Sequence, residues 1–374
     1  MVAAYVVQSY VGSYGPMAHP VGACATAAIS LEEARDKILA GKADFVVAGG
    51  YDDIGAEGMV GFADMNATAS TDDMLAMGLG PDQMSRANDV RRRGFVEAQG
   101  GGTLLLARGD VALALGLPVH GVLAWAGSFG DGIHKSIPAP GMGALAAAMG
   151  GADSPLGLAL RRFGLTADDV ALVSKHDTST GANDPNESAL HHRLQAALGR
   201  TPGNPLWVVS QKALTGHAKG GAAAWQAIGL CQALAAGVVP GNRNLESVDP
   251  AMRRFTHLGF TDTPLCQPLR AGLLTSLGFG HASGMALVLH PDAFEALVPA
   301  DERQAYRAAA EARREVERRR VAEALMGSGG YAKRTHRRFA APDGSDAQAE
   351  EEAAMLLNPK ARLDPATGLF TVAP

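Results

Sequence analysis

The chain has 374 residues, of which 47% are hydrophobic and 19% are charged, and it contains 46 glycines. This length and composition exclude a disordered or coiled-coil protein and allow one large α/β domain or two smaller ones around a sizeable core. The 33 basic and 38 acidic residues give a net charge of −5, so we expect neither a nucleic-acid partner nor an anionic membrane surface.

Sequence elements then follow in alternation. The expected strands cover 18–23, 43–48, 94–107, 119–126, 170–174, 206–210, 273–277 and 285–290. The expected helices cover 24–41, 143–163, 186–198, 220–236 and 302–325, and the second is expected to be interrupted at Gly150-Gly151. Such alternation, with 43–48 read as a parallel strand, predicts a mainly parallel sheet covered by helices. Residues 51–93 form a long polar connection, which is typical of a functional segment or an interface, and 331–374 is expected to be an extended tail.

Three cysteines, Cys24, Cys231 and Cys266, are too few for a disulfide framework. They indicate a reducing compartment, so we expect a cytoplasmic protein. There is no basic segment followed by a long apolar run at the N-terminus, and no run of 18 uninterrupted apolar residues, so neither a signal peptide nor a membrane-spanning helix is expected. No Cys/His spacing suggests a metal site.

Cys24 lies at the junction between the expected strand 18–23 and the helix after it. A thiol in the first turn of a helix meets the positive end of the helix dipole, which can lower its pKa from about 8.5 into the range of roughly 3.5–7.5. A thiolate made in this way is a nucleophile that can hold an acyl group. From position alone, a buried structural cysteine remains the alternative; Cys231 and Cys266 lack this setting and are expected to be structural.

His176 and His217 each follow an expected strand. In a parallel sheet the carboxyl ends of the strands line the active-site crevice, where two imidazoles could donate hydrogen bonds to a developing oxyanion. Structural histidines are the alternative for each. Lys212 could hold charge and orient its neighbours, and Glu187 could pair with that lysine.

The segment Gly278-Phe279-Gly280 joins the last two strands. It could present a backbone N–H to a bound carbonyl, or it could be a plain turn with a core phenylalanine.

Together these segments resemble the β-ketoacyl synthase family of the thiolase-like fold, and most closely the ketosynthases of fungal and actinobacterial type I fatty acid synthases. The resemblance is carried by four motifs in order: Gly22-Ala23-Cys24-Ala25-Thr26, Lys175-His176-Asp177-Thr178-Ser179-Thr180 with Asn183 to Glu187, Lys212 with Gly216-His217, and Gly278-Phe279-Gly280. Two departures stand out. Asp177 replaces a glycine usual in discrete ketosynthases, and His281-Ala282-Ser283 follow the last motif in place of two small residues and Asn.

The resemblance implies an α/β fold layered α-β-α-β-α, with the first half truncated at its N-terminus because Cys24 comes so early in the chain. It divides the chain into an incomplete N-terminal half at 1–108, a C-terminal half at 109–291 that carries both histidine motifs, and a helical and extended tail at 292–374. It also implies a homodimer within a larger assembly.

The resemblance further implies a 3-oxoacyl-[acyl-carrier-protein] synthase that condenses a malonyl thioester with a Cys24-bound acyl chain. His176 and His217 would stabilise the enolate, and Lys212 and Glu187 would set the electrostatics. Substrate-binding roles fall to Thr178 and Thr180 for the pantetheine arm and to Phe279 and Gly280 in the gatekeeper loop. No cofactor is bound directly, because the acyl carrier protein delivers its phosphopantetheine arm.

Two other functions remain open. One is a coenzyme A-dependent thiolase-like acyltransferase, although thiolases place a second cysteine in the final loop and residues 279–281 supply none. The other is an inactive truncated fragment that serves only as an assembly or interface piece.

Overall fold

A six-stranded sheet forms the centre of the protein in the computed structural model, which describes residues 16–132, 140–326, 361–364 and 369–372. Its strands, in spatial order, are β3 (Val122–Gly130), β10 (Ala282–Leu289), β9 (Ala271–Leu277), β4 (Val170–Ser174), β5 (Leu206–Val209) and β7 (Leu258–Gly259). β9, β4, β5 and β7 run parallel, whereas β10 is antiparallel to both β3 and β9. Five of the six strands therefore run in one direction, as the predicted mainly parallel sheet requires, and β10 alone runs the other way. The short turn after β9 leads straight back into β10, and such a turn can join only antiparallel strands.

A second sheet pairs β1 (Phe45–Asp52) with β2 (Gly100–Ala107). The two strands are antiparallel, with Val47 opposite Leu105. The prediction of a parallel strand at 43–48 is therefore wrong: a run of apolar residues marks a strand but does not fix the direction of its partner. Val46 and Leu104 turn one face of this sheet toward the core, while the side chains of Val47 and Leu105 on the other face are exposed.

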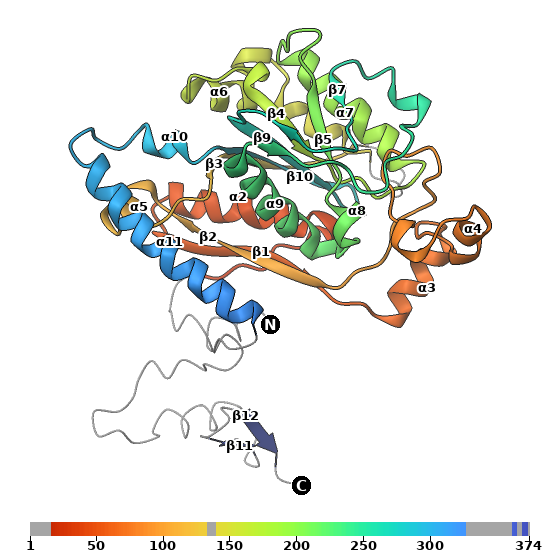
Figure 1. The fold of residues 1–374 in the computed structure, drawn as a ribbon, viewed down its shortest axis with the longest axis horizontal. Helices are drawn as coiled ribbons and strands as arrows, with labels where there is room; N and C mark the ends of the chain where they lie inside the picture. Colours follow the sequence, from red (N-terminus) through yellow and green to blue (C-terminus); the bar gives the residue numbers. More distant parts are fainter. Residues whose placement is uncertain (1–15, 133–139, 327–360, 365–368, 373–374) are drawn as a thin grey trace. The chain divides into compact units, whose positions relative to one another are not determined.

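Two helices, α2 (Thr26–Leu39) and α9 (Ala222–Ala236), lie between the two sheets (Figure 1). Small side chains at the contacts allow the layers to approach closely, and among them Ala27, Ala28, Ala223 and Ala224 are fully buried. On the far side of the large sheet, α6 (Pro155–Arg162) and α7 (Asn183–Ala197) cover a second apolar cluster. These successive layers of sheet and helix agree with the thiolase-like fold that the sequence predicted.

Two expected elements differ in kind from those observed. Residues 18–22 form no strand, and Cys24 lies in a 3₁₀ turn, η2 (Ala23–Ala25), that leads directly into α2. The helix expected at 143–163 is divided into two 3₁₀ segments, η4 (Met142–Ala147) and η5 (Gly151–Asp153), before α6 begins. Gly150 and Gly151 adopt φ of 100° and 59°, a left-handed conformation that ends any helix entering it.

The expected helices at 186–198 and 220–236 and the strands at 170–174 and 206–210 are confirmed as α7, α9, β4 and β5. The connection 51–93 contains α3 (Ala56–Asp64), α4 (Thr71–Ala76) and η3 (Pro81–Gln83). The smaller elements are α5 (Gly109–Ala114), η6 (Ala167–Asp169), α8 (Lys212–Thr215), η7 (Lys219–Gly221), β6 (Val238–Val239), η8 (Pro250–Met252), β8 (Leu265–Cys266) and α10 (Asp292–Glu295).

The chain divides into two units, one formed by 20–306 and the other by 1–19 with 307–374. The expected helix at 302–325 is confirmed as α11 (Arg303–Leu325). Most of the expected tail at 331–374 lies outside the described residues, which there comprise only an antiparallel pair, β11 (Ala361–Asp364) with β12 (Leu369–Val372). Among the helices that the structure describes, none combines the length and apolar character needed to cross a bilayer.

Candidate active site

Three parallel strands of the large sheet end at one edge and deliver three of the sequence motifs there. His176 follows β4, Lys212 follows β5, and Phe279 follows β9. Because parallel strands present their carboxyl ends together, residues that are far apart in sequence meet at this edge.

Cys24 reaches the same edge from the turn that precedes α2. Ser276 Oγ of β9 donates a hydrogen bond of 2.6 Å to the Cys24 carbonyl, which ties the turn to the sheet. Thr26 Oγ1 closes the turn locally, since it accepts from Gly22 N–H at 3.0 Å and donates to Ala23 O at 2.8 Å. A β-carbon on Gly278 would lie 2.1 Å from Gly22 O, so the Phe279 loop and the Cys24 turn approach at a distance that only glycine permits.

Cys24, His176 and His217 meet in a buried cluster. Cys24 Sγ lies 3.2 Å from His217 Nε2. The two imidazole rings stand nearly perpendicular, with centroids 5.2 Å apart. One donor atom from each of the three side chains lies within 4.8 Å of the other two. The structure thus brings together the nucleophile and the two imidazoles that the sequence singled out, from segments about 150 and 190 residues apart.

Hydrogen bonds fix the backbone of His176 at its N–H and at its carbonyl. Its N–H donates to Glu187 Oε1 at 2.6 Å, and the next N–H, of Asp177, donates to Glu187 Oε2 at 2.9 Å. Lys212 Nζ donates to the His176 carbonyl and lies 3.3 Å from His176 Nδ1. A protonated lysine has only protons to offer, so Nδ1 must accept and the ring proton of a neutral His176 stays on Nε2. Glu187 therefore acts on the backbone of His176, rather than through an ion pair with Lys212.

His217 is set by its own turn and by an aromatic neighbour. Gly216 has φ of 71°, and the His217 N–H donates to Val96 O at 2.8 Å. The ring of Phe95 meets the imidazole edge-on with centroids 5.0 Å apart. Among the described residues none gives His217 Nδ1 a hydrogen-bond partner.

Burial controls the protonation of the cluster. It raises the pKa of the Cys24 thiol to about 11, and the opposing influence of Lys212 does not overcome it. The expectation that the helix start would lower the thiol pKa is therefore wrong, since the Cys24 side chain is buried. Burial, together with Lys212, lowers the pKa of both His176 and His217 well below 6.5. Both imidazoles are consequently neutral at pH 7, and the resting sulfur is a thiol.

Burial also lowers the pKa of Lys212 to about 8, although Glu187 and Cys24 favour its charged form. At neutral pH Lys212 is still mostly protonated. It is then the closest cation to the imidazoles.

A buried polar network behind His176 includes residues that the sequence did not assign to the site. Asn88, from the long connection, donates its backbone N–H to Asp184 Oδ2 at 2.9 Å. Burial and the neighbouring Asp177 raise the pKa of Asp184 to about 7. The unusually long polar connection was the only signal for Asn88, because a contact over 89 positions leaves no local pattern.

The expected substrate-binding residues lie close by, with partners of their own. Thr178 Oγ1 and Thr180 Oγ1 are 3.1 Å apart, and Thr180 Oγ1 accepts from the Asn183 N–H at the start of α7 at 3.0 Å. Phe279 stacks on Phe62 of α3, with centroids 5.4 Å apart and planes 17° from parallel. Gly280 is exposed and has φ of 82°.

The Cys24–His176–His217 cluster also has the donor types of a soft-metal site, but its surroundings oppose a divalent cation. A metal-bound histidine usually donates the N–H of its second ring nitrogen to a carboxylate or carbonyl oxygen. His176 Nδ1 instead faces a donor, Lys212 Nζ. Lys219 adds a second positive charge near Cys24. The arrangement therefore favours anion-stabilising chemistry over metal binding.

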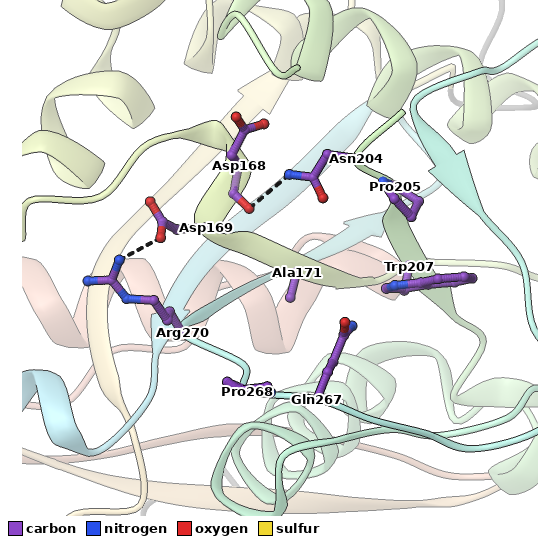
Figure 2. A pocket seen from close by; sticks show the side chains of 9 residues that line it. All are labelled: Asp168, Asp169, Ala171, Asn204, Pro205, Trp207, Gln267, Pro268 and Arg270. Carbon is purple, nitrogen blue, oxygen red and sulfur yellow. Dashed lines mark hydrogen bonds and ion pairs between the residues drawn. The ribbon is translucent and has the colours of Figure 1, made fainter. Parts of the chain in front are cut away.

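A pocket of about 290 Å³ lies at the opposite edge of the sheet (Figure 2). Its lining residues lie before the strands or at their starts: Asp168 and Asp169 come before β4, Pro205 before β5 and Arg270 before β9, while Ala171 and Trp207 are second in β4 and β5. Figure 2 shows Arg270 paired with Asp169, at 2.6 Å, and Asn204 donating to the Asp168 carbonyl. This pocket belongs to the amino ends of the strands and is not the site of Cys24.

The known proteins that resemble this chain are ketosynthases and fatty acid synthase subunits. Residues 1–112 match the N-terminal domain of β-ketoacyl synthase, and residues 120–246 match its C-terminal domain. The fatty acid synthase alpha subunit stcJ of Emericella nidulans is 43% identical over 374 residues, and the fatty acid synthase subunit alpha of Saccharomyces cerevisiae is 33% identical over 398 residues. The alignments include 99% and 83% of this chain but only 24% and 21% of those proteins.

Among solved structures, the noncanonical ketosynthase FabY of P. aeruginosa matches with a TM-score of 0.77 and 25% identity, over 87% of this chain and 51% of that one. A ketosynthase in the AntDE:AntF complex, solved with its type II polyketide synthase acyl carrier protein, matches with a TM-score of 0.66 and 24% identity, over 77% of this chain and 66% of that one. At that identity the second likeness concerns the fold alone.

Proposed function

We propose, from the premise that this chain belongs to the β-ketoacyl synthase family, that it forms the ketosynthase part of a fatty acid synthase and makes 3-oxoacyl thioesters. The observation that supports this proposal most directly is the 3.2 Å contact between Cys24 Sγ and His217 Nε2, next to the neutral imidazole of His176. Within this proposal, 1–108 supplies the nucleophile, 109–291 supplies both histidines, and 292–374 is a tail.

The first half-reaction transfers an acyl group to Cys24. The sulfur attacks the carbonyl carbon of an acyl thioester on the phosphopantetheine arm of an acyl carrier protein. The bond from that carbon to the carrier sulfur breaks, and the thiol proton passes to the departing carrier thiolate. Because the thiol has a pKa of about 11, the proton leaves as the attack proceeds rather than beforehand. The backbone N–H groups of Cys24 and Phe279 are proposed as the donors to the oxyanion.

The second half-reaction begins with a malonyl thioester. Its C–C bond to the carboxylate breaks, carbon dioxide leaves, and the electron pair forms an enolate whose oxygen accepts hydrogen bonds from His176 and His217. The enolate carbon attacks the acyl-Cys24 carbonyl, the carbon–sulfur bond to Cys24 breaks, and the sulfur regains a proton. Lys212 keeps the His176 ring proton on Nε2, as its 3.3 Å approach to Nδ1 requires. Neutral imidazoles suit this role because they donate without attracting the substrate carboxylate as imidazolium would.

Thr178 and Thr180 are proposed to bind the pantetheine arm, and Phe279 with Gly280 to form the movable wall of the acyl site. The partners are the acyl carrier protein and the malonyl and acyl thioesters. We also propose a homodimer within a larger cytoplasmic assembly. Support comes from the three free cysteines and from the exposed apolar side chains of Val47 and Leu105 on the small sheet. Light scattering that finds a monomer at micromolar concentration would contradict the dimer.

The proposal is tested by mixing the full chain with an acyl-loaded carrier protein and measuring the mass of the intact chain. We expect an acyl adduct on wild type and none on the Cys24→Ala variant. A malonyl-loaded carrier should then release carbon dioxide from wild type. Absence of both the adduct and the carbon dioxide would favour an assembly fragment, whereas equal use of acetyl-coenzyme A without decarboxylation would favour the thiolase-like alternative.

A further inference from the structure

The two residues that flank His176 form an ion pair that is buried completely. Lys175 Nζ lies 2.7 Å from Asp177 Oδ1, and both side chains are 0% exposed. The Asn88 amide bridges them, since its oxygen accepts from Lys175 Nζ at 3.2 Å and its nitrogen donates to Asp177 Oδ2 at 2.8 Å. Ser210 Oγ donates to the same Asp177 oxygen at 2.5 Å.

Asp177 also has a backbone conformation that its side chain does not favour. Its φ is +34°, in the left-handed region where a β-carbon is strained and glycine is not. Local sequence therefore does not stabilise this turn. The contacts of the carboxylate with Lys175, Asn88 and Ser210 help to hold it.

The turn in question carries His176. Glu187 fixes the N–H groups of His176 and Asp177, and Lys212 reaches the His176 carbonyl, so the peptide units on both sides of His176 are clamped. The charged groups of Lys175 and Asp177 bind one another, Asn88, Ser188 and Ser210, behind the turn. Neither side chain bonds the imidazole itself, so the position of the ring is the main route by which they act on the chemistry, beside the charge of Asp177 that favours protonated Lys212.

We propose that Lys175 and Asp177 are a coupled pair of positioning residues. Each compensates the buried charge of the other, and together they orient the His176 imidazole. The inference rests on the proposed role of His176 as a donor to the enolate. A turn shifted by about 1 Å is enough to lower a rate roughly 100-fold. A buried charge left without its partner is expected to shift this turn, because it will recruit other partners or water.

The test compares wild type, Lys175→Met, Asp177→Gly and the double variant, all as the full chain. Each single variant should lower kcat for malonyl decarboxylation about 100-fold with KM changed by less than about threefold, since His176 and not the substrate contacts has moved. The double variant, which has no buried charge and a glycine that adopts positive φ freely, should recover to within about tenfold of wild type. Lys42→Met, at an exposed lysine, is the matched control and should match wild type.

Two results would overturn the inference: single variants with kcat within twofold of wild type, or a double variant whose loss equals the product of the single losses. If Lys175→Met or Asp177→Gly does not fold, Lys175→Arg and Asp177→Asn replace them, since arginine keeps the charge and asparagine tolerates positive φ. Lys175→Arg should then retain more activity than Asp177→Asn, and the reverse order would also overturn it.

A second readout separates this inference from the proposed function. The imidazole NMR signals of His176, assigned with His176→Gln, should move in both single variants and return in the double variant. If wild type does not decarboxylate malonyl thioester, the proposed function is wrong. The NMR signals then still test whether Lys175 and Asp177 act together on the position of His176. If the signals are the same in all four proteins, the coupling itself is refuted.

Discussion

Replacing Lys212 by methionine should make the protein more stable and less active. Burial lowers the pKa of Lys212 from 10.5 to about 8. A pKa difference of one corresponds to 1.36 kcal/mol, so keeping Lys212 charged at pH 7 costs the fold about 3 kcal/mol. Methionine removes this cost but also removes the hydrogen bond to the His176 carbonyl, worth about 1–3 kcal/mol. We therefore expect a net gain in unfolding free energy of about 0–2 kcal/mol at pH 7.

The pH dependence identifies the origin of this gain. Between pH 8 and 10.5 the unfolded chain binds the Lys212 proton and the folded protein does not, so wild-type stability rises with pH in that window. The variant lacks this group, and its advantage should be complete below pH 8 and vanish above pH 10.5. Urea unfolding of both proteins at pH 7 and pH 10 measures the difference. An advantage that does not change with pH, or a variant less stable than wild type at pH 7, would refute the reasoning.

The activity of the same variant should fall. Without Lys212 the remaining neighbour of His176 Nδ1 is Ser276 Oγ at 3.4 Å, whose proton goes to the Cys24 carbonyl, so the ring proton of His176 is no longer held on Nε2. The loss of one oxyanion donor costs about 100- to 1000-fold in kcat. Carbon dioxide release from a malonyl thioester measures this, with Lys42→Met as the exposed-lysine control. An active Lys212→Met variant would mean that His176 needs no fixed tautomer.

Three further predictions concern the neighbouring groups. His176→Ala and His217→Ala should each lower malonyl decarboxylation about 100- to 1000-fold while the Cys24 acyl adduct still forms, as intact-mass measurement will show. Alkylation of Cys24 by iodoacetamide should rise about tenfold per pH unit from pH 7 to pH 10, because its thiol pKa is about 11; a rate that levels off near pH 7 would contradict the raised pKa. Glu187→Gln should lower the unfolding free energy by about 1–3 kcal/mol, since one carboxylate oxygen that accepts a backbone N–H becomes a donor, and urea unfolding at pH 7 measures it.

The sequence predicted the site where the relevant signals were local. Short apolar runs marked β4 and β5 with nearly correct bounds, and the rule that parallel strands share a carboxyl edge then brought His176 and the Lys212 motif together. The helix expected at 220–236 is likewise observed as α9, which lies between the two sheets. Fold class followed from the same alternation of elements.

What the sequence could not supply depends on contacts between distant segments. The direction of β1 relative to β2 and the 3₁₀ turns before α6 are decided by packing and by the left-handed glycines at 150 and 151. The Cys24 pKa was predicted with the wrong sign, because the helix-start effect is visible in the sequence while the burial that outweighs it is not. Asn88 was missed for the same reason: its partners lie about 90 to 120 residues away.

The raised thiol pKa and the lowered imidazole pKa values together constrain the order of proton movements. A thiolate–imidazolium pair at rest would require a proton to move from a group of pKa about 11 to one well below 6.5, which is strongly uphill. His217 is therefore poorly suited as a general base for Cys24, although its Nε2 is only 3.2 Å from the sulfur. The same neutrality suits it as a donor to an oxyanion formed beside that sulfur. If the proposed function holds, the two imidazoles therefore serve the carbon–carbon bond-forming half of the reaction, and the departing carrier thiolate takes the proton in the acyl-transfer half.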